Sequence, residues 1–462
     1  MANPVEPPPL FENVDILDNG SEDDLFVSAH QDNISGSNAT SVDESEITKQ
    51  LENIPISYEP SLSSAEQSTP IDEEMEKDDH FLEITITQPQ KMGEGMGSYM
   101  AYRVTTRTNM PMFKDKEFSV LRRFSDFLGL HDKLAEKYLK LGRIVPPAPE
   151  KSVIGTTKIK ISSQDGPIAN GNEFVEKRRA SLERYIQRTA KHPVLVMDPD
   201  FREFLECVEL PKATNTSALS SAGVMRLLNK VGVTVNKITY KMDETDPWFE
   251  EKLNHIEALE TQLRKLHASV EALVSYRKEL ANLTNGVSRS AAMLSACEDH
   301  NSLSRALSQL AETEEKVEAL HLEQANTDFF IFCEILKDYL GLLGAIRDTF
   351  HERTKSFQLW QHAQLMLAKR RESNQKLKLA GKAREQDVAD PEVIAWVAKV
   401  ERGQTSFNKI SQMIKNEMDR FEKHRIEEFK TMFIKYLENH MEHQAQLIKH
   451  WEAFLPEAKA IA

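Results

Sequence analysis

The chain has 462 residues and a formal net charge of -15, a length sufficient for two or three domains. Its three cysteines are too few for a disulfide framework or a cysteine-rich metal site, and they indicate a reducing cytosol. There is no apolar run long enough to span a bilayer and no secretory leader at the acidic, proline-rich N-terminus, so we expect any membrane contact to be peripheral.

The negative charge is concentrated in residues 1–79, which hold 20 Asp and Glu against Lys49 and Lys77. This segment is poor in aromatic residues and rich in Ser, Asn and Pro, a composition that predicts a disordered tail. Within it, Asp24, Leu25 and Phe26 form a short acidic and apolar string of the kind that docks into a basic groove. Such strings also arise by chance in acidic tails, so both interpretations stay open.

Residues 80–212 carry a net charge of +5, with 22 Lys and Arg against 17 Asp and Glu. Residues 81–120 alternate apolar and polar positions and are rich in β-branched residues, which predicts strands of a small antiparallel sheet. Helical periodicity follows over residues 125–141 and 173–191. The sequence therefore predicts a compact α+β domain that is attracted to anionic surfaces.

This domain contains basic residues ordered around an aromatic ring and a proline-rich loop. Arg123 and Phe124 follow the last predicted strand, Lys151 follows a Pro-Pro-Ala-Pro-Glu loop, and Arg178 lies in the second helix. A phosphate on a sugar ring needs forked cationic donors and a flat face beside the ring, so the set predicts a phosphate-binding pocket. The alternative is a surface strand with ordinary basic residues.

Residues 213–242 are expected to form a basic amphipathic helix, because residues 215–242 contain no Asp or Glu. On a helical projection one arc is apolar, comprising Val224, Leu227, Leu228, Val231, Val235 and Ile238. A separate arc is basic, comprising Arg226, Lys230, Lys237 and Lys241. Such a helix can lie in the headgroup plane of a bilayer. The alternative is a linker helix packed on a neighbouring domain.

Residues 243–462 are almost free of proline, which predicts three very long helices near residues 246–294, 299–379 and 391–455. Apolar residues recur every three or four positions in the first helix, as in Ile256, Leu259, Leu263, Leu266, Val270 and Leu273. Helices of this length need partners along their whole length. We therefore expect an all-α, antiparallel coiled coil that dimerises, and we expect the dimer to bury this seam.

A basic cluster, centred on Lys369, Arg370 and Arg371, lies where the second long helix is expected to end and the chain to turn back. If that turn is at the far end of the coiled coil, the cluster forms a positive tip that can touch an anionic membrane. Basic ends of coiled coils also occur without such a role.

The sequence contains no pattern typical of an enzyme. We found no nucleophile elbow, phosphate-binding glycine loop or zinc-protease helix, and we expect neither a cofactor nor a metal. His440 and His443 lie three apart on a charged helix without a convincing third ligand. The basic regions lack a nucleic-acid-binding motif, so nucleic acid is not an expected partner.

The order of Arg123-Phe124, the proline-rich loop with Lys151, and Arg178 resembles the PX (phox homology) domain. The resemblance implies that Arg123 holds the 3-phosphate of an inositol lipid, with Phe124 against the ring and Ser125 assisting at the phosphate. It implies that Lys151 and Arg178 bind the remaining oxygens. Val153 and Ile154, next to the proline loop, correspond to residues that dip into the bilayer in that family, although packing inside the domain explains them equally well.

A PX-like domain, an amphipathic helix and three long helices in this order resemble the sorting nexins that carry a BAR domain. The resemblance covers residues 81–462 and includes Phe174-Val175-Glu176-Lys177-Arg178-Arg179 and the C-terminal residues 451–462. The N-terminal tail is similar to theirs only in its acidity and its single Asp-Leu-Phe string.

The resemblance implies a peripheral protein of the cytoplasm and of early endosome membranes, sorting receptors into tubules for retrograde transport to the Golgi. It implies binding to phosphatidylinositol 3-phosphate or the 3,5-bisphosphate and to anionic membranes. It also implies homodimers, or heterodimers with other BAR-type sorting nexins, and partnership with retromer and cargo receptors. The alternative is a soluble coiled-coil scaffold whose PX-like domain binds protein rather than lipid.

Overall fold

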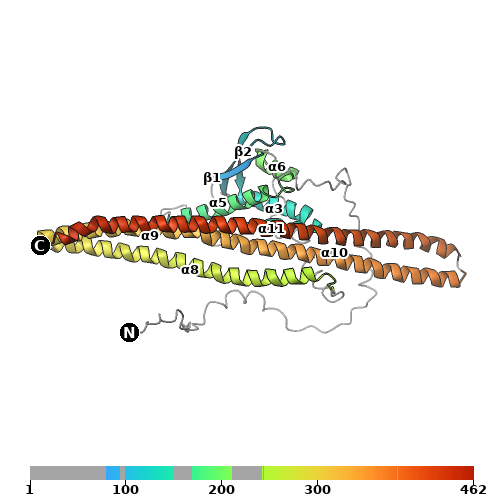
Figure 1. Ribbon diagram of the computed structural model, residues 1–462. Coiled ribbons are helices and arrows are strands. Elements are labelled where there is room, and N and C mark those ends of the chain that lie inside the picture. The colour runs from blue at the N-terminus through green and yellow to red at the C-terminus, as the bar shows by residue number, and fades with distance from the viewer. Residues whose placement is uncertain are drawn as a thin grey trace, which may run out of the picture. The chain divides into compact units, whose positions relative to one another are not determined.

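The computed structural model describes residues 80–93, 99–149, 169–210, 242, 244–381 and 383–461, with backbone alone for 88, 169–173 and 383–390. These residues all belong to the unit Asp72–Ala462. They form a small sheet with helices against it, followed by a group of long helices (Figure 1). Within the described residues, every helix is too short or too polar to cross a lipid bilayer.

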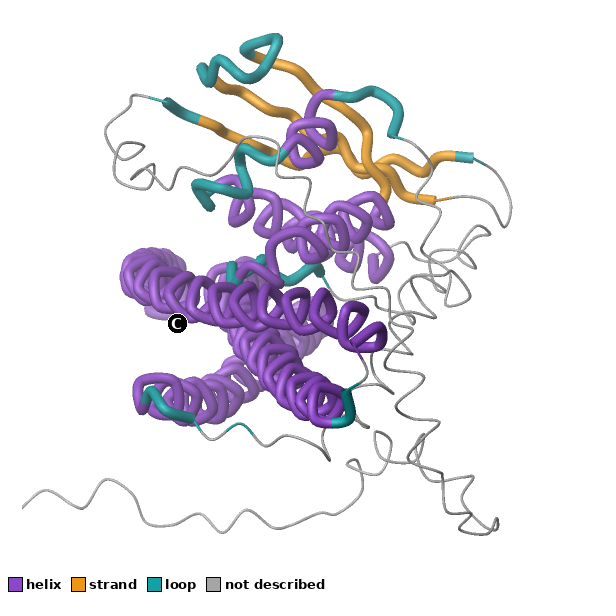
Figure 2. The backbone as a smooth tube through the Cα atoms, turned by 90° about the vertical axis from the view of Figure 1, so that its right-hand side faces the viewer, coloured by secondary structure: helices purple, strands orange, loops and turns teal. Residues whose placement is uncertain are grey.

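The sheet consists of three antiparallel strands in the order β1 (Leu82–Met92), β2 (Tyr99–Thr108) and β3 (Glu117–Arg123). Its register places Ala101 of β2 opposite Arg123 at the end of β3. Period-two alternation gives the sheet one apolar face, and helices lie on that side of it (Figure 2). The predicted α+β domain is confirmed.

The helices of this domain are α3 (Phe124–Tyr138), the short η3 (Leu139–Leu141), α5 (Ala169–Ala190) and α6 (Pro199–Glu206). Both helices that the periodicity predicted are confirmed, whereas α6 was not predicted because its eight residues are too few for a periodic pattern. The buried core joins the apolar face of the sheet to these helices through Ile84, Ile86, Val104, Phe127, Leu134, Leu182, Ile186, Phe201 and Phe204.

The long helices are α8 (Pro247–Cys297), α9 (Asn301–Asp328), α10 (Glu334–Leu379) and α11 (Ala383–Lys459). A single π-helical turn, η4 (Phe329–Cys333), joins α9 to α10, so the chain stays helical from residue 301 to residue 379. The helix expected over residues 299–379 is therefore confirmed. α9 packs on both α8 and α11, and α10 packs along α11 (Figure 1).

The last long helix begins earlier than the sequence indicated. We expected Pro391 to open it, but α11 begins at Ala383 and also continues past Pro456. A proline removes one backbone hydrogen bond and strains the preceding turn without necessarily ending a helix. α11 packs on both α10 and α9, and Glu457, next to Pro456, pairs with Arg305 of α9.

Part of the predicted apolar seam on α8 is covered by the chain itself. Ile256, Leu263 and Val270 are buried in a core shared with α10 and α11, and this core also contains Leu336, Leu343, Ile346, Ile410 and Ile414. These three seam residues are therefore not available to a second subunit. The expectation that a dimer buries them was wrong, because the helices of one chain already pack on that stripe.

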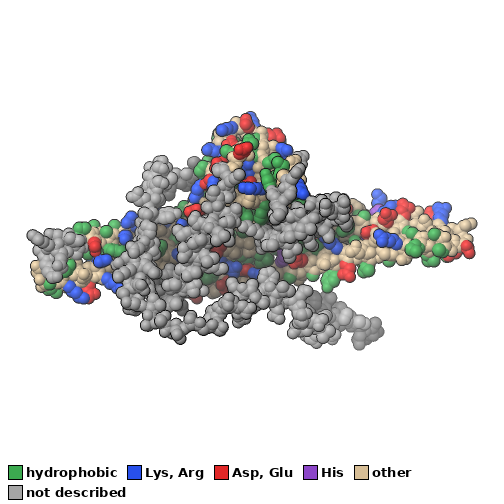
Figure 3. Space-filling view, turned by 180° about the vertical axis from the view of Figure 1, so that it is seen from behind, with side chains coloured by type: hydrophobic (Ala, Val, Ile, Leu, Met, Phe, Trp, Pro, Cys, Tyr) green, Lys and Arg blue, Asp and Glu red, His purple; other side chains and the backbone are tan. Residues whose placement is uncertain are grey.

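A second apolar stripe on α8 is exposed in the single chain. It follows heptad spacing, with intervals of four, three, four and seven residues, and comprises Tyr276, Leu280, Leu283, Val287 and Leu294. Leu283 has 64% of its surface exposed, and Tyr276 has 69%. We call these five residues the α8 stripe. Figure 3 shows hydrophobic side chains exposed among charged ones on the long helices. A heptad-spaced stripe of this kind is typical of a surface that pairs with another helix.

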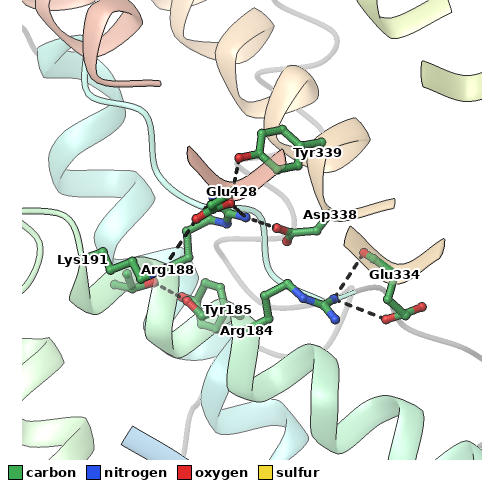
Figure 4. A network of polar contacts seen from close by, with 9 residues as sticks. Arg184, Tyr185, Arg188, Lys191, Glu334, Asp338, Tyr339 and Glu428 are labelled. Atoms are coloured by element: carbon green, nitrogen blue, oxygen red, sulfur yellow. Dashed lines mark hydrogen bonds and ion pairs between the residues drawn. The ribbon is translucent and has the colours of Figure 1, made fainter. Parts of the chain in front are cut away.

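Buried ion pairs fasten the small domain to the long helices. Arg188, near the end of α5, lies between Asp338 of α10 and Glu428 of α11, and its Nη2 donates to Glu428 Oε2 at 2.8 Å (Figure 4). The hydroxyl of Tyr339 donates to the same Glu428 carboxylate at 2.7 Å. Although burial opposes its charge, the two acids hold the pKa of Arg188 above its ordinary value, so the network stays ionised.

A second group of charges lies next to this network. The buried Glu417 of α11 accepts hydrogen bonds from the ring of His192 (3.0 Å) and the backbone N–H of Ile144 (3.3 Å). Arg420 and Arg143 also pair with this carboxylate. Both groups join residues that are far apart in the sequence, so they position the small domain on the long helices.

Candidate phosphoinositide-binding site

The two adjacent arginines at the end of β3 have different roles. Arg122 is 1% exposed, and its Nε donates to the carbonyl oxygen of Phe204 at 2.8 Å. Further donors of the same guanidinium reach the carbonyls of Leu121 and Cys207. The bonds to Phe204 and Cys207 satisfy backbone oxygens at the end of α6, where a helix leaves its carbonyls unpaired. Arg122 is thus a structural residue.

Arg123 occupies the junction between β3 and α3, where it is half-buried. Its Nε donates to Asp126 Oδ1 at 2.9 Å, and its backbone N–H donates to Asp126 Oδ2 at 2.9 Å. The guanidinium carbon lies 6.0 Å from the centroid of the Tyr99 ring. Asp126 engages the Nε of the guanidinium and fixes its direction, which favours bidentate binding of a phosphate by the remaining donors.

Phe124 and Arg178 come together as the sequence predicted. The guanidinium carbon of Arg178, on α5, lies 4.5 Å from the centroid of the Phe124 ring and 4.4 Å from that of Phe174. Burial lowers the pKa of Arg178 from its ordinary value, but an arginine remains charged at neutral pH. The arrangement presents an aromatic face and a desolvated cation side by side.

Ser125 lies in the first turn of α3, directly after Phe124. Its half-buried side chain is close to the helix N-terminus, where backbone N–H groups and the helix dipole favour an anion. Lys151, Val153 and Ile154 lie outside the described residues, so their predicted roles stay predictions.

The structure describes only some of the other residues that were predicted to contact the membrane or a partner. The apolar and basic residues of the expected amphipathic helix, 224–241, and the string Asp24, Leu25 and Phe26 lie outside the described residues. Lys369, Arg370 and Arg371 lie near the end of α10, with Lys369 and Arg371 exposed. Arg370 is half-buried and pairs with Glu392 of α11 at 3.3 Å.

Sequence reasoning missed two aromatic residues of this site, Phe174 and Tyr99. Phe174 precedes Arg178 by four residues on α5, a spacing that places two side chains on one helix face, so it could have been found. Tyr99 could not have been found, because its approach to Arg123 depends on the pairing of β2 with β3.

Comparisons with known proteins agree with this fold. Residues 110–207 match the family model described as PX domain, and residues 224–457 match the model described as Vps5 C terminal like. The chain is 56% identical to sorting nexin-2 of Bos taurus over 85% of its own length and 75% of the relative's. It belongs to the sorting nexin family.

The chain is also similar to a second relative and to a solved structure. The chain is 52% identical to sorting nexin-1 of Homo sapiens over 84% of its length and 74% of the relative's. Among solved structures, it is similar to the cryo-EM structure of the SNX-BAR Mvp1 tetramer, with 17% identity and a TM-score of 0.46. That alignment covers 80% of this chain and 99% of the other.

The fold is therefore that of a sorting nexin with a PX domain, built on the small sheet, and a BAR domain, built on the long helices. Sorting nexins of this type are non-enzymatic proteins that act in endosomal sorting and on membrane curvature. A PX domain implies phosphoinositide binding, and the BAR domain implies membrane binding and dimerisation.

Proposed function

We propose that this sorting nexin binds 3-phosphorylated phosphoinositides on the cytoplasmic face of early endosomes through Arg123, Phe124, Ser125, Lys151 and Arg178. The observation that carries the proposal is the stacking of Arg178 on Phe124, next to an Arg123 whose Nε is held by Asp126. A desolvated cation and an oriented guanidinium suit a phosphate, and the ring suits the face of an inositol.

Membrane attachment then combines several weak contacts. Val153 and Ile154 enter the leaflet beside the pocket, the helix over residues 213–242 lies in the headgroup plane, and Lys369 and Arg371 contact lipid phosphates. Because these contacts are tethered in one protein, effective concentration multiplies their individual affinities.

The α8 stripe supports dimerisation, because a heptad-spaced apolar surface in water favours pairing with a similar helix. The dimer is a homodimer or a heterodimer with another BAR-type sorting nexin. We propose that it shapes endosomal tubules that carry receptors toward the Golgi with retromer. The string Asp24, Leu25 and Phe26 is a candidate contact for a further partner.

Flotation of the full chain on liposomes tests the lipid assignment. Vesicles of phosphatidylcholine and phosphatidylserine should float the protein when they contain phosphatidylinositol 3-phosphate or the 3,5-bisphosphate, and much less when they contain the 4-phosphate. Comparing the two 3-phosphorylated lipids decides which one is preferred. Equal flotation with all inositol lipids would contradict a specific pocket.

The competing function is a soluble scaffold whose PX domain binds protein. It predicts no flotation with any inositol lipid, although the chain still dimerises. The same liposome series, with the oligomeric state measured in parallel by sedimentation, therefore separates the two functions.

A further inference from the structure

Arg353 is a charged residue buried among aromatic rings of the long helices. It lies on α10 with 4% of its surface exposed, and its guanidinium carbon is 3.5 Å from the centroid of the Phe249 ring and 4.8 Å from that of Phe407. Burying a charge is costly, and a buried ion pair is often no more stabilising than apolar side chains of the same volume. The stability of the core alone therefore does not account for an arginine here.

Each of the three nitrogens of this guanidinium donates a hydrogen bond. Nη1 donates to Glu244 Oε2 at 2.5 Å and Nη2 to Glu244 Oε1 at 2.9 Å, while Nε donates to Ser411 Oγ of α11 at 2.9 Å. A bidentate pair of this kind fixes the orientation of its partner as well as the distance. Although burial opposes its charge, the hydrogen bonds from Arg353 hold the pKa of Glu244 below its ordinary value, so the pair is ionised at neutral pH.

A second ion pair holds the same short segment. Asp246 is the N-cap of α8, where its Oδ1 accepts from the backbone N–H of Trp248 at 3.1 Å, and its Oδ2 accepts from Lys415 Nζ of α11 at 2.7 Å. The backbone N–H of Asp246 donates to Glu244 Oε1 at 3.1 Å. The N-cap bond alone suffices to begin a helix, so the ion pairs to α10 and α11 are additional. The four residues of these two pairs, which we call the α8 anchor, are Glu244, Asp246, Arg353 and Lys415.

The α8 anchor comes directly after the segment that we propose to lie in the membrane. Lys241, the last basic residue of the predicted amphipathic helix, precedes Glu244 by three residues in the sequence. A link of three residues spans at most about 11 Å. Because Glu244 is held on α10, a helix that ends near Lys241 is tethered to the BAR domain by a link too short to let the two move far apart.

We propose that the Glu244–Arg353 pair couples the membrane helix to the BAR domain. With the C-terminal end of the helix held at the α8 anchor, insertion of the helix into a leaflet places the BAR domain on the same patch of bilayer, and both bend that patch together. The inference rests on the proposed membrane role of residues 213–242. Glu244 and Arg353 are positioning residues, because they act through the helix that they hold rather than by contact with lipid.

An insertion separates this coupling from the stability of the α8 anchor. Six residues, Gly-Gly-Ser-Gly-Gly-Ser, are placed between Met242 and Asp243 of the full chain, which keeps every anchor residue but lengthens the link. The same insertion between Lys212 and Ala213, before the predicted helix, is the control. Both variants and the parent are mixed with vesicles of phosphatidylcholine, phosphatidylserine and phosphatidylinositol 3-phosphate. Flotation measures binding, and electron microscopy measures tubulation.

The insertion after Met242 should reduce tubulation about 5-fold and leave flotation within about 2-fold of the parent, because a flexible link still tethers the helix but no longer places it. The control insertion should match the parent in both measurements. Parental tubulation by the variant with the longer link would overturn the coupling, and so would an equal loss in the control. A parent that neither floats nor forms tubules would overturn the proposed function together with this inference.

Substitutions test the ion pair itself. Glu244→Gln keeps the shape of the side chain but removes the charge that Arg353 binds, so tubulation should fall about 5-fold while flotation stays within about 2-fold of the parent. Glu422→Gln is the matched control, because Glu422 of α11 accepts from Lys252 Nζ at 2.6 Å and so joins α8 to α11 beyond the anchor. It should form tubules as the parent does. Parental tubulation by Glu244→Gln, or an equal loss in Glu422→Gln, would overturn the role of the pair.

Combining the two changes tests whether the pair acts through the link. In the chain that already carries the insertion after Met242, adding Glu244→Gln should change the remaining tubulation by less than about 2-fold, because the helix is no longer placed by the anchor. A full further loss would show that Glu244 stabilises the BAR domain rather than positions the helix, and would overturn the inference. If Glu244→Gln does not fold, the two insertion variants decide the question by themselves.

Discussion

Arg122 and Arg123 are adjacent at the end of β3, yet Arg122 is bound to the backbone carbonyls at the end of α6 while Arg123 is held by Asp126 at the edge of the candidate lipid pocket. Arg122 therefore stabilises the fold, whereas Arg123 is a candidate lipid-binding residue. Strand alternation is the cause, because successive side chains of a strand point to opposite faces.

Substituting the two arginines should therefore give opposite results. Arg123→Ala should weaken binding to 3-phosphoinositide vesicles by about 30-fold to 1000-fold, equivalent to about 2 to 4 kcal/mol, with little change in melting temperature. Arg122→Ala should lower the free energy of unfolding by about 3 kcal/mol, because it leaves buried carbonyls without a hydrogen-bond donor. Arg107→Ala, which removes an exposed arginine of β2, is the charge control. Parental lipid affinity in Arg123→Ala would contradict the pocket.

The amphipathic helix is tested with Leu228→Glu, which places a charge on the predicted apolar arc. A peptide of residues 213–242 should gain helicity on anionic vesicles, as followed by circular dichroism, and the substituted peptide should not. In the full chain, Leu228→Glu should abolish tubulation and leave the dimer intact. Asn229→Glu adds the same charge off that arc and should reduce binding less. An unmodified peptide that stays unfolded on vesicles would rule out the helix as a membrane wedge.

Dimerisation is expected to depend on the α8 stripe rather than on the buried seam. The double variant Leu280→Glu and Leu283→Glu should shift residues 213–462 from dimer to monomer in sedimentation velocity, because both charges lie on an exposed apolar stripe. Leu359→Glu, on an equally exposed leucine of α10, should remain dimeric. Retention of the dimer by the stripe variant would show that another surface pairs the subunits.

The basic residues near the end of α10 should contribute to membrane binding unequally. Replacing Lys369 and Arg371 by Ala should cost about 1 kcal/mol each on anionic vesicles and reduce tubulation. Arg370→Ala should cost less, because its guanidinium already pairs with Glu392. All variants should sediment as dimers. If the Lys369 and Arg371 double variant forms tubules as well as the parent does, these two residues do not contribute to tubulation.

Attachment of the PX domain to the long helices should weaken in acid through Glu417. Although burial opposes its charge, the hydrogen bond from His192 and the charges of Arg420 and Arg143 hold its pKa below the ordinary value. The stabilising contribution is therefore complete above about pH 4.3, the unfolded value, and is lost as the pH falls through the lower folded value.

Thermal unfolding between about pH 3 and pH 7 measures this contribution. Glu417→Gln should lower the melting temperature at neutral pH and flatten its dependence on acid, whereas Glu452→Gln, an exposed residue of the same helix, should follow the parent. If the melting temperature of Glu417→Gln depends on acid as that of the parent does, other carboxylates control the loss of stability at low pH.

The sequence by itself determined the order of the domains and was enough to propose most of the candidate site. Alternation of apolar residues over 81–120 predicted the sheet, and the scarcity of proline after Pro247 predicted the long helices, because both patterns follow from local backbone geometry. Arg123, Phe124 and Arg178 could be proposed as binding residues because a phosphate on a ring demands those side chains, whatever the fold around them.

Only the tertiary structure decided which of these residues are covered by neighbouring elements and which are exposed. Arg122 and Arg123 are equivalent in the sequence, and nothing in the sequence around Leu263 and Leu283 marks the first as covered and the second as exposed. Their roles depend on which elements pack nearby: α6 against β3, and α10 against the first half of α8. Such contacts join residues far apart in the chain, so no local pattern of charge or hydrophobicity can encode them.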